Sequence, residues 1–243
     1  MAHGTPDWGV TAGDVTTFQL FDVGEAVARL GSIDRFDRRG DVMFLEDFER
    51  TPTTWEFTTS GAGAYAGLTT RTARSGDFAL ELTCGSTVDE LAEAIAHVHY
   101  PVVSRVGLEL HMRNVDSGEQ FTARLGATNA DGQQLFAVRL DVTAQTLAYL
   151  NSAGGYTVFA TGVNVASGGR NIHPLKFVAD LATAQYVRVL FDDRAYDLSG
   201  IAGRQPAATG TPLTELKFTH QSAAGANPTL VIDDVILTQN EPA

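Results

Sequence analysis

Short strand-like segments follow one another from Asp41 to the end of this chain, and they constrain its fold more than any other feature. Segments rich in β-branched and aromatic residues alternate with turns of Gly, Asn, Asp and Ser, as in DFALELTC (77–84), RVGLELHMR (105–113) and QYVRVLFDD (185–193). NADG at 129–132 has the composition of a tight hairpin turn. Helical periodicity is almost absent and strands do not alternate with helices. The pattern therefore predicts an all-β antiparallel sandwich or jelly roll.

The composition supports a folded domain and excludes several partners. Apolar residues make up 44% of the 243 residues, which is enough for a sizeable core. The formal net charge of −12, from 17 basic and 29 acidic residues, argues against a nucleic-acid partner or an anionic membrane surface. Calcium, a basic protein surface and a neutral glycan are all compatible with that charge. No apolar run is long enough for a transmembrane helix.

The single cysteine and the first residues bear on where the protein works. Cys84 alone cannot form an intramolecular disulfide or an ordinary thiolate zinc site, so we interpret it as a small buried apolar residue. The opening MAHGTPDWGVTAGD lacks the basic start and the apolar run of a signal peptide. We therefore expect synthesis in the cytoplasm and, for any role outside the cell, release with a virion or another assembled particle.

Residues 1–40 are predicted to form an N-terminal arm, and residues 41–243 the β-sandwich domain. Asp22 and Glu25 have the spacing of a helix capping box, and Gly31 marks a C-terminal stop. A helix that begins at Asp22 and stops at Gly31 would be too short to be stable alone, so it would have to dock on the main domain or on another subunit. Its apolar stripe would consist of Val23, Ala26, Val27 and Leu30.

Two adjacent carboxylates interrupt the last apolar strand, LVIDDVILT (230–238). Side chains alternate between the two faces of a strand, so Asp233 and Asp234 are expected on opposite faces. Whichever face is buried therefore contains a carboxylate. A buried carboxylate must be compensated by a cation, a metal ion or several N–H donors.

Three segments together resemble a known family. FLEDFE (44–49) followed by Trp55, then RSGDFALEL (74–82), and finally the closing LVIDDVILT are similar to elements of the β-jelly-roll carbohydrate-binding modules with a galactose-binding-like fold. The resemblance implies that the first and last strands lie close together. The chain departs from that family in the greater length of its β domain and in its N-terminal segment, which has no counterpart there.

The resemblance also implies a structural calcium near both ends of the domain. Its ligands here would come from Asp47 or Glu49, from the turn at Ser75–Asp77, and from Asp233 or Asp234. Calcium takes carboxylate and carbonyl oxygens of this kind. The alternative is that Asp233 accepts hydrogen bonds from backbone N–H groups or an arginine, without any metal.

Closely spaced histidines give a second metal hypothesis. If AIAHVHY is a strand, His97 and His99 point the same way, and His111 can join them in a zinc or nickel site. The preceding residues fit a helix equally well, with Thr87 and Glu90 as its capping box. On a helix the two neighbouring histidines would diverge and could not chelate one ion.

No catalytic motif is evident in the sequence. It lacks G-x-S-x-G, H-E-x-x-H and a phosphate-binding glycine loop. Asp192, Asp193 and Asp197 form an acidic cluster that is either a loop calcium site or a solvated junction. We therefore predict a non-enzymatic protein.

Two tyrosines are the predicted ligand-binding residues. Tyr149 and Tyr156 flank the turn NSAGG, and aromatic rings at such a place can stack on sugar rings. Two functions remain open. The first is a structural or assembly protein, such as a phage capsid decoration or tail component, with other protein subunits as partners. The second is a module that binds a polysaccharide or a cell-surface glycan.

Overall fold

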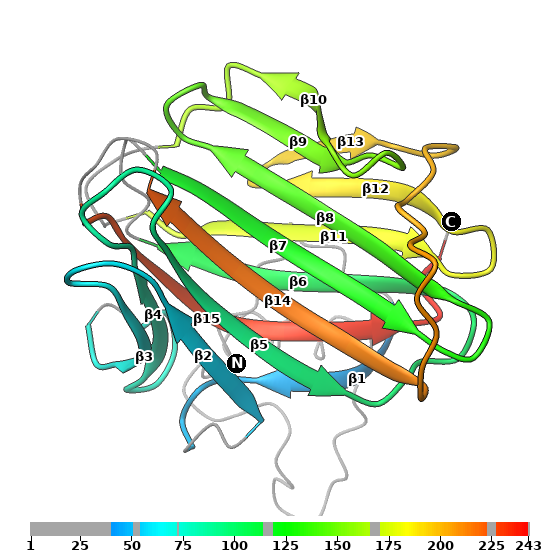
Figure 1. The fold of residues 1–243 in the computed structure, drawn as a ribbon, viewed down its shortest axis with the longest axis horizontal. Helices are drawn as coiled ribbons and strands as arrows, with labels where there is room; N and C mark the ends of the chain where they lie inside the picture. The colour runs from blue at the N-terminus through cyan, green and yellow to red at the C-terminus, as the bar shows by residue number, and fades with distance from the viewer. Residues whose placement is uncertain are drawn as a thin grey trace, which may run out of the picture. The chain divides into compact units, whose positions relative to one another are not determined.

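The computed structural model describes residues 40–50, 54–71, 73–113, 119–165, 171–222 and 227–242. Within these ranges the regular elements are all β-strands, which form two antiparallel sheets (Figure 1). The predicted all-β antiparallel sandwich is confirmed. The helix expected in the N-terminal arm lies outside the described residues. In the part of the chain that the structure describes, no helix is long and apolar enough to cross a membrane.

The strands divide into an eight-stranded and a seven-stranded sheet. Along the eight-stranded sheet the order is β13 (Arg194–Asp197), β12 (Gln185–Phe191), β11 (His173–Asp180), β6 (Arg105–Arg113), β15 (Thr229–Gln239), β4 (Ala79–Thr83) and β3 (Tyr65–Thr69), and β1 (Asp41–Glu46) also pairs with β15. Along the seven-stranded sheet the order is β10 (Tyr156–Thr161), β9 (Thr146–Leu150), β8 (Gln133–Asp141), β7 (Glu119–Thr128), β14 (Leu213–Ser222), β5 (Leu91–Val98) and β2 (Trp55–Thr59). The consecutive strands β4, β5, β6 and β7 alternate between the sheets, as the crossing connections of a jelly roll require.

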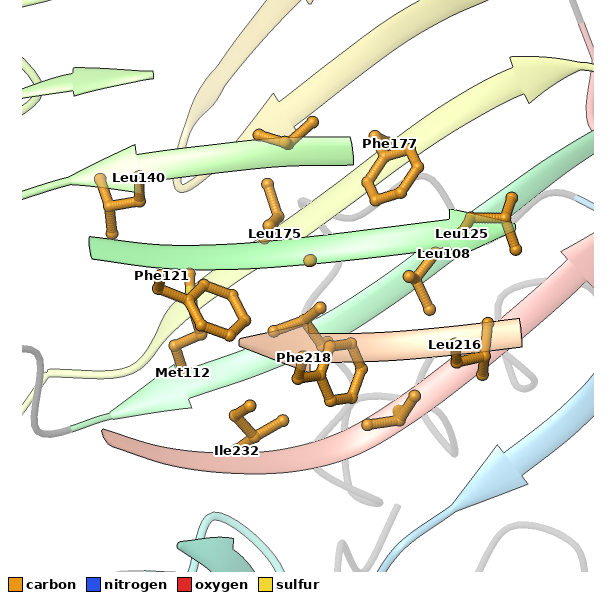
Figure 2. Packing of buried hydrophobic residues seen from close by; sticks show 14 of the residues in the cluster. Leu108, Met112, Phe121, Leu125, Leu140, Leu175, Phe177, Leu216, Phe218 and Ile232 are labelled. Atoms are coloured by element: carbon orange, nitrogen blue, oxygen red, sulfur yellow. The ribbon is translucent and has the colours of Figure 1, made fainter. Parts of the chain in front are cut away.

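The core follows from side-chain alternation along the strands. In β14, Leu216 and Phe218 are fully buried. Glu215 and Lys217, which alternate with them along the strand, face away from the core. Figure 2 shows Phe218 beside Phe121, with Met112 and Ile232 from the opposite sheet. Trp55 stacks on Phe218 with 5.4 Å between the ring centroids. The buried apolar layer therefore lies between the two sheets.

The NADG turn connects β7 and β8 as predicted. Asn129 accepts from Gly132 through its side-chain oxygen at 3.0 Å and donates its own N–H to the Gly132 carbonyl at 2.9 Å. The hairpin keeps an unbroken register from Thr128↔Gln133 to Gln120↔Asp141. The tight-turn interpretation is therefore confirmed.

The first and last described strands lie side by side, as the resemblance implied. β1 pairs antiparallel with β15, from Asp41↔Gln239 to Glu46↔Val235. Glu46 at the end of β1 accepts from the indole N–H of Trp55 at 3.2 Å, which fixes the ring against the core. Trp55 thus links the end of β1 to the core residue Phe218.

Candidate functional site

Asp233 is buried on β15 and its carboxylate is occupied by backbone N–H donors. Its Oδ2 accepts from the N–H groups of Arg74 at 2.7 Å and Ser75 at 3.1 Å, and its Oδ1 accepts from the N–H of Asp234 at 2.8 Å. Only 2% of the residue is exposed. Three N–H donors therefore compensate much of the cost of burying this carboxylate.

Asp234 reaches the same turn because the strand is irregular at this point. Its φ of 49° lies in the left-handed region, and the register between β15 and β6 shifts between Asp233 and Ile236. Its carboxylate forms an ion pair with Arg74 and accepts from the Ser75 hydroxyl at 3.0 Å. The expectation that the two carboxylates point to opposite faces is therefore wrong, because the bulge turns both toward residues 74 and 75.

Glu49 holds the other side of that turn. Its Oε1 accepts from the N–H groups of Asp77 and Phe78, each at 2.9 Å. Gly76 between the two contacts has a φ of 63°, and a Cβ there would lie 2.2 Å from Cδ of Glu49. Glycine is needed at this position both for its conformation and for the close approach of the carboxylate.

The residues predicted as calcium ligands thus gather around one turn, and their described contacts are with hydrogen-bond donors. Asp233, Asp234 and Glu49 face N–H groups, a hydroxyl and a guanidinium, and Asp47 accepts from the N–H of Glu49 at 3.2 Å. Among the described residues, no group of three or more His, Cys, Asp or Glu side chains is placed to hold a metal ion. These are the contacts of the metal-free alternative. Calcium binding stays a prediction of the resemblance, to be tested by thermal unfolding with calcium and with a chelator.

Asp233 should make stability depend on pH with a defined sign. Burial raises its pKa to about 6 from an ordinary 3.8, although Ser75 donates to it. Between pH 3.8 and 6 the native state binds more protons than the unfolded state, so stability falls as pH rises through this window.

The measurement is urea unfolding of the wild type and of Asp233→Asn at pH values from 4 to 7. The free energy of unfolding of the wild type minus that of the variant should fall as the pH rises from 4 to about 6, because only the wild type has this titrating carboxyl. A constant difference across that range would show that Asp233 titrates alike in the folded and unfolded states.

A cleft of about 610 Å³ lies along β12 and β13, and Asp197 is one of its lining residues. Its walls come from the start of β6, the β11–β12 turn, both strands of the β12–β13 hairpin and the loop after β13. The polar lining residues are Arg105, Asp180, Thr183, Gln185, Arg188, Asp197 and Ser199. The apolar ones include Val187, Ala195 and Tyr196.

Two ion pairs fix the arginines of this cleft. Arg105 Nε lies 3.4 Å from Asp180 Oδ2, and both side chains are partly exposed. Arg188 donates to the Pro242 carbonyl at 2.8 Å and to Glu241 Oε2 at 2.9 Å. Both guanidinium groups are therefore held in place beside the cleft before any ligand arrives.

The β13 side of the cleft carries an exposed carboxylate, and Tyr196 beside it turns its ring toward the core. The hydroxyl and the backbone N–H of Ser199 donate to Asp197 and lower the pKa of its carboxyl, which is therefore ionised at neutral pH. The ring of Tyr196 packs edge-on against Phe159 of β10, with 5.3 Å between centroids. This contact joins the edge strands of the two sheets and fixes the tyrosine.

Comparison with protein-family models and with curated proteins finds no match for the sequence. Solved structures do match. One of them is Cip1, described as a cellulose induced protein, with a TM-score of 0.56 and 16% sequence identity. The match covers 80% of this chain and 96% of Cip1. An endo-β-1,4-glucuronan lyase from the fungus Trichoderma reesei gives 0.50 at 12% identity, over 82% and 96% of the two chains. The carbohydrate recognition domain of Emp47p gives 0.50 at 11%, over 82% and 94%. The chain shares its jelly-roll fold with these proteins. At these identities the likeness shows the fold alone.

The two tyrosines predicted to bind ligand lie on opposite faces of the β9–β10 hairpin. Tyr156 pairs with Leu150 across the β9–β10 hairpin, so Tyr149 is paired with Thr157 and points the other way. Tyr149 packs inward against Tyr186 and Phe159, at 5.6 and 6.4 Å between ring centroids. The two rings therefore cannot stack on one sugar, and only Tyr156 faces outward.

His111 is separated from His97 and His99, which line one pocket beside β5. The segment around His97 is strand β5, so the helix alternative is wrong for residues 91–98. His97 lies on the seven-stranded sheet near Glu215, 3.8 Å away, whereas His111 lies on the eight-stranded sheet. Each faces away from the core on its own sheet, so they cannot share the zinc or nickel ion considered from the sequence.

Proposed function

We propose that this domain binds a glycan in the cleft along β12 and β13, as a non-catalytic module. The observation that carries the proposal is the combination, in one 610 Å³ cleft, of an apolar surface and converging polar groups. Val187 and Ala195 supply the apolar part. The names of two proteins with this fold, a carbohydrate recognition domain and a glucuronan lyase, support a carbohydrate as the ligand.

The chemistry of the cleft suits a neutral sugar. A sugar ring has C–H faces that pack on apolar and aromatic groups, and hydroxyls that both donate and accept hydrogen bonds. Asp180 and Asp197 supply acceptors, while Arg105 and the Gln185 amide supply donors. The arginines and aspartates of the lining, two of each, balance in formal charge. A neutral hexose or pentose unit therefore fits this cleft better than an ion does.

Asp197→Ala is expected to weaken glycan binding at least tenfold, because hydrogen bonds to charged groups are among the stronger ones in binding sites. The measurement is calorimetric titration with the neutral oligosaccharide that gives the strongest signal on a glycan array. Asp193→Ala is the matched control, since Asp193 lies on the same hairpin, is exposed and does not line the cleft. Unchanged binding by Asp197→Ala, or equal losses in both variants, would contradict the proposal.

The assembly role predicted from the sequence stays a prediction, as do protein subunits as partners and a place in a virion. The described residues and the similar structures do not bear on it. Its test is the solution mass of the full chain, measured by size exclusion with light scattering. A closed oligomer supports assembly, and a 25.9 kDa monomer argues against it.

A further inference from the structure

Arg139 and Tyr156 form a stacked pair on the outward face of the seven-stranded sheet. The guanidinium carbon of Arg139 lies 4.1 Å from the centre of the Tyr156 ring. Arg139 is on β8 and Tyr156 on β10, and the small side chain of Ala148 on β9 lies opposite Arg139. The stack holds the guanidinium plane in a fixed position on the sheet.

Unlike Arg124 and Lys217 on the same face, Arg139 has no carboxylate partner among the described residues. Arg124 forms an ion pair with Glu215, and Lys217 lies 2.6 Å from Glu93. In a chain with 29 acidic and 17 basic residues, an arginine without such a partner is unexpected. Within the described ranges, the guanidinium of Arg139 contacts the Tyr156 ring, and no carboxylate forms an ion pair with it.

The nearest acidic residue on the same strand is already engaged. Asp141 accepts from the Gln120 amide at 2.7 Å through Oδ2 and from the N–H of Ala144 at 2.7 Å through Oδ1. The direct cross-strand neighbours of Arg139 are Thr122 and Ala148, neither of which carries a charge. The positive charge of Arg139 is therefore left for a ligand.

Apolar surface lies next to this charge. Val158 of β10 pairs with Ala148, so it lies on the same row of the sheet as Arg139, and half of it is exposed. Tyr156 lies on the same face of β10, two residues before it. The face thus offers a fixed guanidinium beside an aromatic ring and an aliphatic side chain.

We propose that Arg139 and Tyr156 form a second binding site, separate from the cleft, for the carboxylate of an acidic sugar. A guanidinium matches a carboxylate in a bidentate arrangement, and the adjacent ring and Val158 match the C–H face of the sugar. The net charge of −12 repels a polyanion at long range. The expected ligand is therefore an isolated uronic acid in an otherwise neutral glycan.

The test compares two probes on the full chain. One is a neutral β-linked gluco-oligosaccharide, and the other is the same oligosaccharide carrying a single glucuronic acid. We expect the wild type to bind the acidic probe at least tenfold more tightly, and Arg139→Gln to bind both alike. Arg124→Gln, on the same face, and Tyr156→Phe, which keeps the ring, should retain the preference.

Three outcomes would overturn the site: no preference in the wild type, a preference that persists in Arg139→Gln, or an equal loss in Arg124→Gln. Asp197→Ala separates this site from the cleft, because it should weaken binding of the neutral probe and leave the preference for the acidic one. A neutral probe that never binds while the acidic one does would count against the cleft and for the second site.

Discussion

His220→Gln is expected to lower the free energy of unfolding by about 3–5 kcal/mol, the usual cost of removing one partner of a buried ion pair. The imidazole lies entirely inside the sandwich. Its Nδ1 is 2.8 Å from the Leu82 carbonyl on the opposite sheet, and its Nε2 is 2.9 Å from Glu119 Oε2 on the neighbouring strand. Neither side chain of the His220–Glu119 pair is exposed.

The contacts of His220 indicate a protonated ring. Burial alone would lower the pKa of the imidazole, but the Cys84 thiol and the Glu119 carboxylate beside it raise that pKa to about 10. A pKa raised on folding means that the stabilisation is fully present below the unfolded value of about 6.5 and is lost as the pH rises through 10. The difference between wild type and His220→Gln should therefore shrink between pH 7 and pH 10.

Urea unfolding at several pH values measures both effects, provided that the variant is folded by circular dichroism in the absence of urea. Gln221→Ala is the control, because the neighbouring side chain points outward and donates to Asp89 in an exposed contact. That variant should stay within about 0.5 kcal/mol of the wild type. A loss for His220→Gln that is small, or that does not change with pH, would show that the buried ring is neutral.

The fold was predictable because its signals are local. Alternation in segments such as β14 and β15 and the turn composition of NADG are readable within a few residues, and the structure has strands and a hairpin there. The two adjacent aspartates in the last strand also predicted a buried carboxylate that needs compensating donors, and Asp233 has three N–H donors. Its bulge was not predictable, since the left-handed Asp234 depends on register with β6, which is set by residues more than a hundred positions away.

The sites were less predictable because they depend on long-range register. The cleft combines Arg105, Asp180, Gln185 and Asp197, which no motif links. The prediction that Tyr149 and Tyr156 stack on one sugar did not take the hairpin register into account. Across a hairpin that pairs Leu150 with Tyr156, residues 149 and 156 differ by one step and face opposite sides. The β8–β9 register then places Arg139 opposite Ala148, and from there its guanidinium reaches the Tyr156 ring.

Glu241→Gln is expected to cost about 3–5 kcal/mol for the same physical reason, at a different place in the molecule. Glu241 Oε1 lies 2.7 Å from Nζ of Lys176, and its Oε2 accepts from Arg188 at 2.9 Å. The Lys176 and Glu241 side chains are both fully buried. The substitution keeps the shape of the side chain and removes the negative charge that two cations share.

The surrounding residues are fitted closely to this carboxylate. Thr238 donates its hydroxyl to Oε1 at 2.5 Å, and a Cβ at Gly107 would lie 2.8 Å from the same oxygen. Gly107 therefore leaves the space that the charge cluster fills. Because the packing is tight, a loss of stability in a single variant can come from packing as well as from charge.

A double-mutant cycle separates the two causes. Lys176→Met, Glu241→Gln and the double variant are compared by urea unfolding, and the coupling energy between the two sites should be about 1–3 kcal/mol if the charges interact directly. The pair of Lys217 and Glu93 on the outer face of the other sheet, with side chains 19% and 14% exposed, should couple less strongly when treated in the same way, because water reaches both groups. Additive losses at Lys176 and Glu241 would mean that packing, and not the ion pair, holds the C-terminal residues on β6 and β11. A large coupling would instead show that the last residues of the chain stabilise the sheet through charge.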